Sequence, residues 1–187
     1  MIKPWTVLNT REVIRDRFIT HTIDTCERSD GTRIPTYHVL DLPIWPVTVP
    51  LTADGNVVLV REYRHPGKVV MTGLPGGGGE PGETDPKIIA ERELTEETGF
   101  VPKSFHALGT CYPNPAIQTN QLHIFLALGC EKRTGQTLDP AEEIEIVQMP
   151  LSDFEAYEDF DIQHCHHAAA LFYLSRFFAK HPDLRPV

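Results

Sequence analysis

The most informative stretch of the chain is a glycine-rich loop that leads directly into a short acidic helix. Residues 76–79 are four consecutive glycines, and the segment that begins at Pro86 carries Glu93, Glu96 and Glu97. Side chains three and four positions apart project from the same side of a helix, so these carboxylates are expected to lie together and repel one another. A hard divalent cation among them removes that repulsion, and oxygen ligands of this kind suit Mg²⁺, with Mn²⁺ as a substitute.

The boundaries of this helix are marked in the sequence. Asp85 is expected to cap its start, Pro86 occupies the first helical position, where proline is tolerated, and Gly99 closes its end. A solvated acidic face is the ordinary alternative for such a run of charges. The glycine loop, together with Glu83 and Arg92 at their spacings, favours the metal interpretation.

This segment resembles the Nudix box, a family motif. The second half of the motif is matched in full by Arg92, Glu93, Leu94, Glu96, Glu97, Gly99 and Phe100. In the first half, Gly77 and Glu83 stand at the positions of the box glycine and glutamate. Eight residues separate Glu83 from Arg92, one more than in the motif. The extra residue is placed at Thr84–Asp85, before the helix, so the helix carboxylates keep their register.

The resemblance implies the roles of the box residues. Glu93 and Glu97 are then metal ligands, Glu96 ligates directly or through water, and the backbone carbonyl of Gly76 is a further ligand. Arg92 is interpreted as an organiser that holds neighbouring carboxylates in place. A surface ion pair without a role in the site is the alternative for Arg92.

A general base is expected in the acidic segment 138–146, which resembles a family segment that closes over the metal site. Glu142 and Glu143 are the two candidates, and the sequence leaves the choice between them open. An ionised carboxylate near the metal would orient and deprotonate the attacking water. An ordinary acidic surface loop is the alternative.

Residues outside the box are expected to choose the substrate. Pro115 lies fifteen positions after Phe100, a spacing that resembles the ADP-ribose pyrophosphatase branch, although a proline also shapes loops for other reasons. The segment Arg61–Arg64 resembles a motif of that branch, and the Arg64 guanidinium would meet a phosphate with Arg61 nearby. Trp5 is a candidate to stack on the base, with core or dimer packing as the alternative.

Two departures from the branch bear on this assignment. Glu62 stands where the branch has glutamine, and Gly73 stands where it commonly has glutamate. The resemblance still implies hydrolysis of ADP-ribose, a small-molecule nucleotide sugar, to AMP and ribose 5-phosphate. Hydrolysis of another nucleotide sugar, such as GDP-mannose, is the alternative within the family. A sensor that binds nucleotide sugars without turnover is the alternative from another class.

The order of segments predicts an α/β fold with a mixed sheet sandwiched by helices. Strands are predicted at 17–26, 32–40, 45–52, 57–63, 69–74, 106–111, 122–128 and 144–149, and further helices at 151–157 and 166–179. The resemblance implies the Nudix α/β/α sandwich as a hydrolase domain, residues 44–187. Residues 1–43 would form an N-terminal β-hairpin or sheet extension that is continuous with this domain. Family likeness implies a homodimer, with this extension as the dimerisation element.

Composition excludes several classes of partner. A net charge of -9 argues against nucleic acids and anionic membranes. The chain has no apolar run of transmembrane length and does not begin with a signal-peptide pattern, so a cytoplasmic location is expected. Its four scattered cysteines are expected to be reduced thiols. The run from His164 to His167 lacks a second Cys/His pair at zinc-finger spacing, so a helix-start or interface role is expected there.

Overall fold

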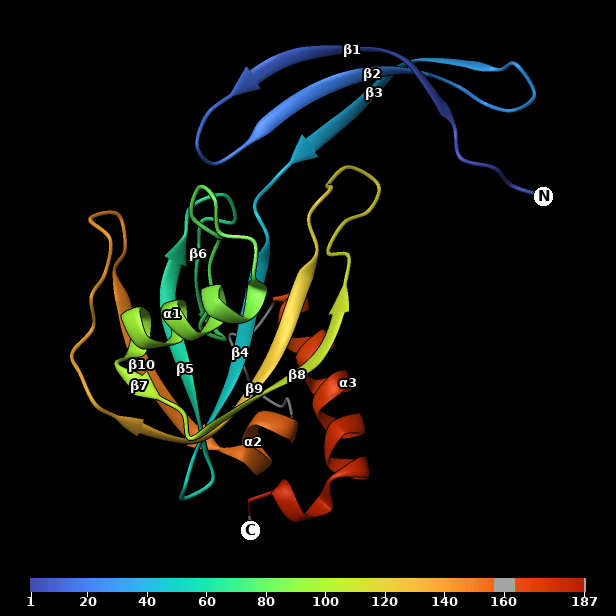
Figure 1. Cartoon of the computed structure of the whole chain (residues 1–187). Coiled ribbons are helices and arrows are strands. Elements are labelled where there is room, and N and C mark those ends of the chain that lie inside the picture. The colour runs from blue at the N-terminus through green and yellow to red at the C-terminus, as the bar shows by residue number, and fades with distance from the viewer. Residues whose placement is uncertain (157–163, 187) are drawn as a thin grey trace. The chain divides into compact units, whose positions relative to one another are not determined.

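A computed structural model describes residues 1–156 and 164–186 of the chain, which folds into two compact units (Figure 1). The larger unit comprises Trp45–Cys111 and Leu122–Val187. The smaller unit comprises Met1–Ile44 together with Tyr112–Gln121, so a segment far along the chain joins the N-terminal residues.

The larger unit contains one mixed β-sheet. Its strands are β4 (Trp45–Thr52), β5 (Asn56–Arg64), β6 (Val69–Gly73), β7 (Phe100–Val101), β8 (Ser104–Cys111), β9 (Leu122–Lys132) and β10 (Ile144–Pro150). The strand order is β10-β5-β4-β9-β7, with β6 paired to β5 and β8 paired to β9. Only the pairing of β4 with β9 is parallel among the described strand pairs, so the predicted mixed sheet is confirmed.

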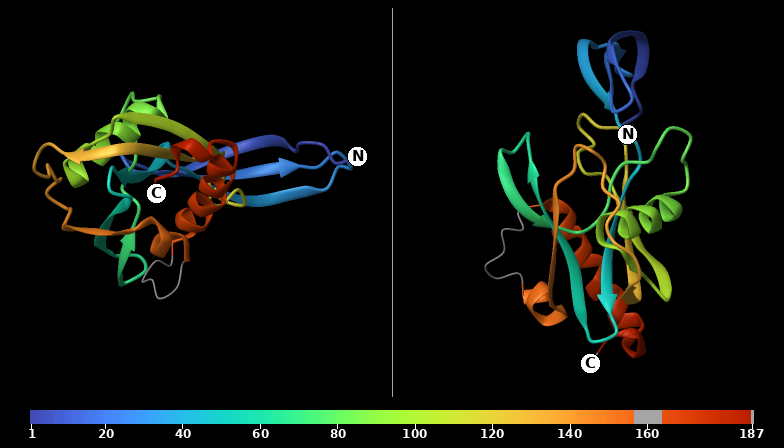
Figure 2. Two further views of the ribbon diagram at one scale, coloured as in Figure 1. Left: turned by 90° about the horizontal axis from the view of Figure 1, so that it is seen from below. Right: turned by 90° about the vertical axis from the view of Figure 1, so that its left-hand side faces the viewer.

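Helices cover both faces of this sheet (Figure 2). They are α1 (Pro86–Thr98), α2 (Leu151–Ala156) and α3 (Cys165–Lys180), followed by a 3-10 turn, Pro182–Leu184. Alternate residues of β5 point to opposite faces. Val57 and Leu59 pack in the core with Phe154 of α2 and Leu174 of α3, whereas Val58 packs with Leu94 of α1. The predicted α/β/α sandwich is therefore confirmed. The predicted end of the second helix at residue 157 lies outside the described residues.

The smaller unit contains a three-stranded antiparallel sheet, which includes the predicted hairpin and adds one strand to it. Its strands are β1 (Thr6–Arg15), β2 (Thr20–Glu27) and β3 (Arg33–Asp41), in the order β1-β2-β3. The predicted hairpin is present as β2 and β3, which pair antiparallel, whereas strand β1 was not predicted. Every residue of β1 is exposed, so the strand has no buried face to produce an alternating pattern, and its pairing with β2 is interrupted by irregularities.

The segment Tyr112–Gln121 is bound to this sheet by long-range hydrogen bonds. The Leu40 N–H donates to the Ile117 carbonyl at 2.8 Å, and the Tyr37 hydroxyl donates to the Ala116 carbonyl at 3.0 Å. Within residues 1–156 and 164–186, none of the helices combines the length and apolar character needed to cross a bilayer. All four cysteines are free thiols.

Candidate active site

Helix α1 begins and ends where the sequence indicates. The Asp85 carboxylate accepts a hydrogen bond from the Lys87 N–H at 2.9 Å and so caps the first turn. Gly99 ends the helix in the left-handed conformation with a φ of 72°, and its N–H donates to the Thr95 carbonyl at 2.8 Å. A Cβ at Gly99 would lie 2.3 Å from the Thr134 carbonyl oxygen, so glycine is required there for both conformation and space.

The glycine-rich loop packs directly against two carboxylates of α1. Glu93 and Glu97 are only 8% and 4% exposed, which is unusual for ionisable side chains. The Gly76 N–H donates to Glu97 Oε2 at 2.9 Å. A Cβ at Gly77 would lie 2.7 Å from the Glu93 carboxylate. The absence of a side chain at Gly77 therefore lets the loop backbone approach the Glu93 carboxylate closely, whereas at Gly76 it leaves room for the backbone of Pro46 and Val47.

Arg92 connects the other carboxylates of the box. Its guanidinium donates to Glu83 Oε2 at 2.9 Å and to Glu96 Oε2 at 2.8 Å, and it lies 3.0 Å from Glu93 Oε1. Burial opposes the charge of Arg92, but the hydrogen bonds with Glu83 and Glu96 outweigh it and raise the pKa of the guanidinium. The hydrogen bond from Arg92 lowers the pKa of Glu83. The expected pairing of Arg92 with neighbouring carboxylates is present, and Glu83 joins it despite the inserted residue.

The two buried carboxylates are poorly suited to carrying their charges alone. Burial raises the pKa of Glu93 to about 7, and the Arg92 charge only partly offsets it. Burial also raises the pKa of Glu97 well above its usual range, with the Glu93 charge as the next cause. The charges of Glu62 and Glu142 add to the rise at Glu97. Four carboxylates therefore share one electrostatic environment.

The two candidates for the general base differ in their surroundings. The charge of Glu142 raises the pKa of Glu62, Glu93 and Glu97, which places it within electrostatic reach of the buried carboxylates. Its carboxylate accepts a hydrogen bond from the Asp139 N–H at 2.9 Å, so the acidic segment is folded back on itself. Glu143, the other candidate, lies at the next position, and both residues are exposed. Of the two candidates, Glu142 is the one whose charge acts on the buried carboxylates.

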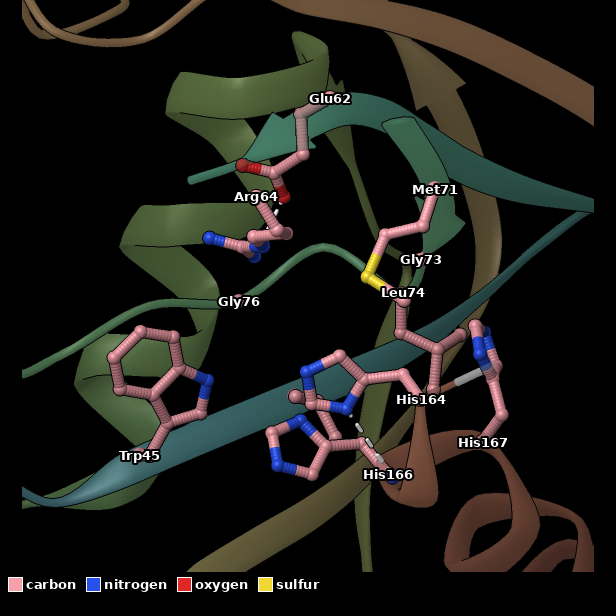
Figure 3. Close-up of a pocket in the computed structure, with 11 residues that line it drawn as sticks. Trp45, Glu62, Arg64, Met71, Gly73, Leu74, Gly76, His164, His166 and His167 are labelled. Carbon is pink, nitrogen blue, oxygen red and sulfur yellow. Dashed lines mark hydrogen bonds and ion pairs between the residues drawn. The ribbon is translucent and has the colours of Figure 1, made fainter. Parts of the chain in front are cut away.

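A pocket adjoins this carboxylate cluster (Figure 3). It is lined by Trp45, Val47, Glu62, Arg64, Met71, Gly73, Leu74, Gly76, His164, His166 and His167. Glu62 and Arg64 form an ion pair at the end of β5. Burial raises the pKa of Glu62, and the Arg64 charge opposes that rise. The expected phosphate ligand Arg64 thus lies in a pocket that shares Gly76 and Glu62 with the carboxylate cluster.

The other residues predicted to bind the substrate lie in different parts of the chain. Arg61 is an exposed residue of β5, opposite Thr72 of β6 in the strand register. Trp5 and Pro115 belong to the smaller unit. The Trp5 ring makes an edge-to-face contact with Tyr37 at a centroid distance of 5.8 Å, and Tyr37 also binds the segment that contains Pro115. Their contact with a substrate stays a prediction.

Two features of the site were missed from the sequence. Glu62 was noted only as a departure from a glutamine, although a carboxylate at this place adds a fourth negative charge. The histidines of α3 were assigned a helix-start role, which His164 does have, because its side chain accepts the His166 N–H as the N-cap. Their position in the pocket carried no local signal, because it depends on how α3 packs against the sheet.

Two family models match the chain, one over its N-terminal residues and one over most of the rest. The NUDIX domain model matches residues 44–168, more than half of the chain, and the nucleoside diphosphate sugar hydrolase N-terminal domain model matches residues 5–40. The chain is 25% identical over 151 residues to a methanol dehydrogenase activator of Bacillus methanolicus, with 80% of each chain covered. It is 33% identical over 107 residues to an ADP-ribose pyrophosphatase of Bacillus subtilis strain 168, covering 55% of this chain and 56% of the relative. A crystal structure of an ADP compounds hydrolase matches with a TM-score of 0.82 at 25% identity and covers 97% of both chains.

Proposed function

Because the chain belongs to the Nudix hydrolase family, we propose that it hydrolyses the diphosphate of a nucleotide sugar and that ADP-ribose is its preferred substrate. Addition of water across the diphosphate yields AMP and ribose 5-phosphate. The observation that carries the proposal is the pair of buried carboxylates, Glu93 and Glu97, held against the glycine loop beside Arg92.

The chemistry of the donor set fits a divalent cation, which members of this family generally use. Glu93 and Glu97 are buried carboxylates with raised pKa values, and Glu62 and Glu142 add negative charge beside them. Oxygen-only donors of high charge suit Mg²⁺ or Mn²⁺ rather than softer metals. Glu93 and Glu97 would hold the ion, with Glu96 in support. A bound ion of this kind polarises the phosphoryl oxygens and neutralises charge on the leaving group.

Several residues of the chain have tasks of their own in this proposal. Arg92 holds Glu83, Glu93 and Glu96 in fixed positions, which presets the carboxylates before substrate arrives. Glu142 orients the attacking water and accepts its proton, since its charge already acts on the buried carboxylates. The proposed ion would offset the electrostatic repulsion between these neighbouring carboxylates.

The choice of ADP-ribose has three supports. The relative with 33% identity is an ADP-ribose pyrophosphatase, and the matching crystal structure is that of an ADP compounds hydrolase. The N-terminal residues match a domain of nucleoside diphosphate sugar hydrolases. Arg64, a guanidinium in the pocket beside the carboxylates, is suited to bind a phosphate.

A panel of substrates tests the proposal. Phosphatase-coupled phosphate release is measured with Mg²⁺ for ADP-ribose, GDP-mannose, UDP-glucose, NADH and a diadenosine polyphosphate, with EDTA as the control. The expected result is metal-dependent turnover with the highest kcat/KM for ADP-ribose. Preference for GDP-mannose would overturn the substrate assignment while keeping the reaction type. Binding of the panel without any turnover would instead indicate a sensor.

We also propose that the protein is a homodimer and that the N-terminal sheet contributes the contact. The sheet exposes large apolar side chains along its first strand and the following turn, at Trp5, Val7, Leu8, Val13, Ile14 and Phe18. An edge strand with exposed apolar side chains is a site at which another chain can pair. A second copy of the chain is the simplest partner for it.

A further inference from the structure

The lining of the pocket beside the carboxylate cluster is rich in hydrogen-bond donors. Trp45, Arg64, His164, His166 and His167 all line it. Indole and guanidinium groups only donate, and each neutral imidazole offers one N–H. Glu62, the carboxylate of this lining, is already paired with Arg64. The pocket therefore matches a ligand that presents acceptor oxygens.

Two of the histidine rings are turned into the pocket by the start of α3. His164 is the N-cap, and its extended backbone, with a φ of −89° and a ψ of 127°, brings its ring beside that of His166 at a centroid distance of 3.8 Å (Figure 3). The His164 Nδ1 accepts the His166 N–H. A neutral imidazole that accepts at Nδ1 carries its proton on Nε2, so the free end of the His164 ring is a donor.

The ring of the third histidine is buried without hydrogen bonds to the described residues. His167 is 1% exposed, and neither its Nδ1 nor its Nε2 has a hydrogen-bond partner among the described residues. Buried polar groups are normally hydrogen-bonded, and leaving one unpaired is costly. Burial also lowers the pKa of both His166 and His167 to about 3, so the two rings are neutral at ordinary pH and each offers one N–H donor and one acceptor nitrogen.

The position of the pocket indicates which part of a ligand it would receive. Gly76 lines the pocket, and its N–H binds the Glu97 carboxylate. Glu62 also lines the pocket and acts electrostatically on Glu97. A group in the pocket therefore adjoins the place where the diphosphate would be cleaved.

We propose that this pocket is the subsite for the sugar phosphate half of the substrate, with Arg64 facing the phosphate and His164, His166 and His167 donating to phosphate and hydroxyl oxygens. The inference rests on the proposed function. The phosphate oxygens of a sugar phosphate only accept, which suits the Arg64 guanidinium and the indole and imidazole N–H groups, whereas a nucleobase edge presents donors as well as acceptors and has no such anionic group.

A transition-metal site is the competing explanation for the histidines. Ligand atoms of His164, Cys165 and His166 all lie within 4.8 Å of one another. However, Cys165 is exposed and does not line the pocket, whereas both histidines do. The histidine rings thus serve the pocket rather than a site that includes the thiol.

Calorimetric titration of the whole chain with ribose 5-phosphate and, separately, with AMP tests the proposal. His166→Leu, which removes the ring donor, should weaken binding of ribose 5-phosphate about three- to tenfold, the value of one hydrogen bond, and leave AMP binding unchanged. His166→Gln, which restores an N–H donor, should recover most of the affinity. His181→Leu, at the exposed C-terminal cap of α3, is the matched control and should change neither ligand.

Several results would overturn the inference. These are failure of the wild-type chain to bind ribose 5-phosphate at millimolar concentration, equal weakening of both ligands by His166→Leu, or no weakening at all. Co²⁺ binding with a thiolate charge-transfer band that Cys165→Ser abolishes would assign the histidines to a metal. Turnover of nucleotide sugars by the wild-type chain alongside any of these results would leave the proposed function standing. Absence of turnover would instead remove the proposed function itself.

Discussion

At the scale of single residues, the site contains ionisable side chains in buried positions, where the charged form is disfavoured. Glu93 and Glu97 are almost fully buried, and burial is the largest cause of their raised pKa values. A folded chain gains nothing in stability from two such carboxylates, because water solvates them better. Their placement is therefore explained by the chemistry of the site rather than by the needs of the fold.

Glu97→Gln should show that the Glu97 carboxylate is needed for turnover but not for the stability of the fold. The amide oxygen of glutamine can still accept the Gly76 N–H, so in EDTA the melting temperature should stay the same or rise. Turnover with Mg²⁺ should fall by at least about 100-fold, because even partners that only support metal ligands typically contribute 10–100-fold. Calorimetric melting and phosphate release from ADP-ribose measure the two effects.

Glu91→Gln is the matched control for this change. Glu91 lies on the same helix, is partly exposed, and its side chain forms a surface ion pair with Lys87 at 3.6 Å. Turnover should be unaffected, and the stability change should stay below about 1 kcal/mol. Undiminished turnover of Glu97→Gln would refute the metal role of Glu97.

His167 is expected to make the stability of the folded protein depend on pH in the acid range. Its pKa is about 6.5 in an unfolded chain and is lowered to about 3 by burial in the folded one. The unfolded chain therefore binds a proton that the folded chain does not. The stability associated with the neutral ring is fully present above about pH 6.5 and is lost as the pH falls towards the folded value.

Replacing His167 with Phe should remove this part of the pH dependence. Between about pH 7 and about pH 5, the loss of unfolding free energy should be smaller in His167→Phe than in the wild type by about 2 kcal/mol. Urea unfolding at the two pH values measures the difference. Identical losses in the two proteins would show that His167 is not buried in its neutral form.

At the scale of elements, the geometry of the site depends on where α1 stops. Gly99 adopts a left-handed conformation, and the chain then turns so that the Arg133 and Thr134 N–H groups both donate to the Gly99 carbonyl. This turn fixes the end of the helix that carries Glu97. The left-handed conformation of Gly99 therefore helps to determine where the Glu97 carboxylate lies.

Gly99→Ala should destabilise the protein more than Gly82→Ala. Both glycines have positive φ, 72° and 93°, but a Cβ at Gly99 would meet the Thr134 carbonyl, whereas nothing lies within 4 Å of one at Gly82. Gly82→Ala should cost about 1–2 kcal/mol for its conformation alone. Gly99→Ala should cost about 1–3 kcal/mol more for the clash. Equal losses in urea unfolding would show that the helix end relaxes freely.

At the scale of the whole molecule, the exposed β1 strand predicts self-association. Ile14→Asp should shift the protein towards the monomer in sedimentation velocity, because a buried unpaired charge opposes interface formation. Ile88→Asp is the matched control, since Ile14 and Ile88 are 52% and 57% exposed and undergo the same change. A wild-type chain that sediments as a monomer, or equal effects of both variants, would contradict a dimer through the N-terminal sheet.

Most of the larger unit was predictable from the sequence, and part of the smaller one was not. Buried strands such as β4 and β5 consist of near-continuous apolar residues between turn signals, which mark their limits within a residue. β1 escaped prediction because it is stabilised by pairing with β2 and not by burial of an alternating face. Pairing partners are set by the fold, so a strand of this kind leaves little trace in its own sequence.

The sequence by itself determined what is local in this site: the cap at Asp85, the stop at Gly99, and the spacing that puts Glu93, Glu96 and Glu97 on one side of α1. Helix periodicity and turn conformations depend on neighbours within a few positions, so they can be read along the chain. Only the tertiary structure decided which distant groups join them. Glu62 and the histidines at the start of α3 reach the site through strand pairing and helix packing, in which residues far apart in the chain become neighbours.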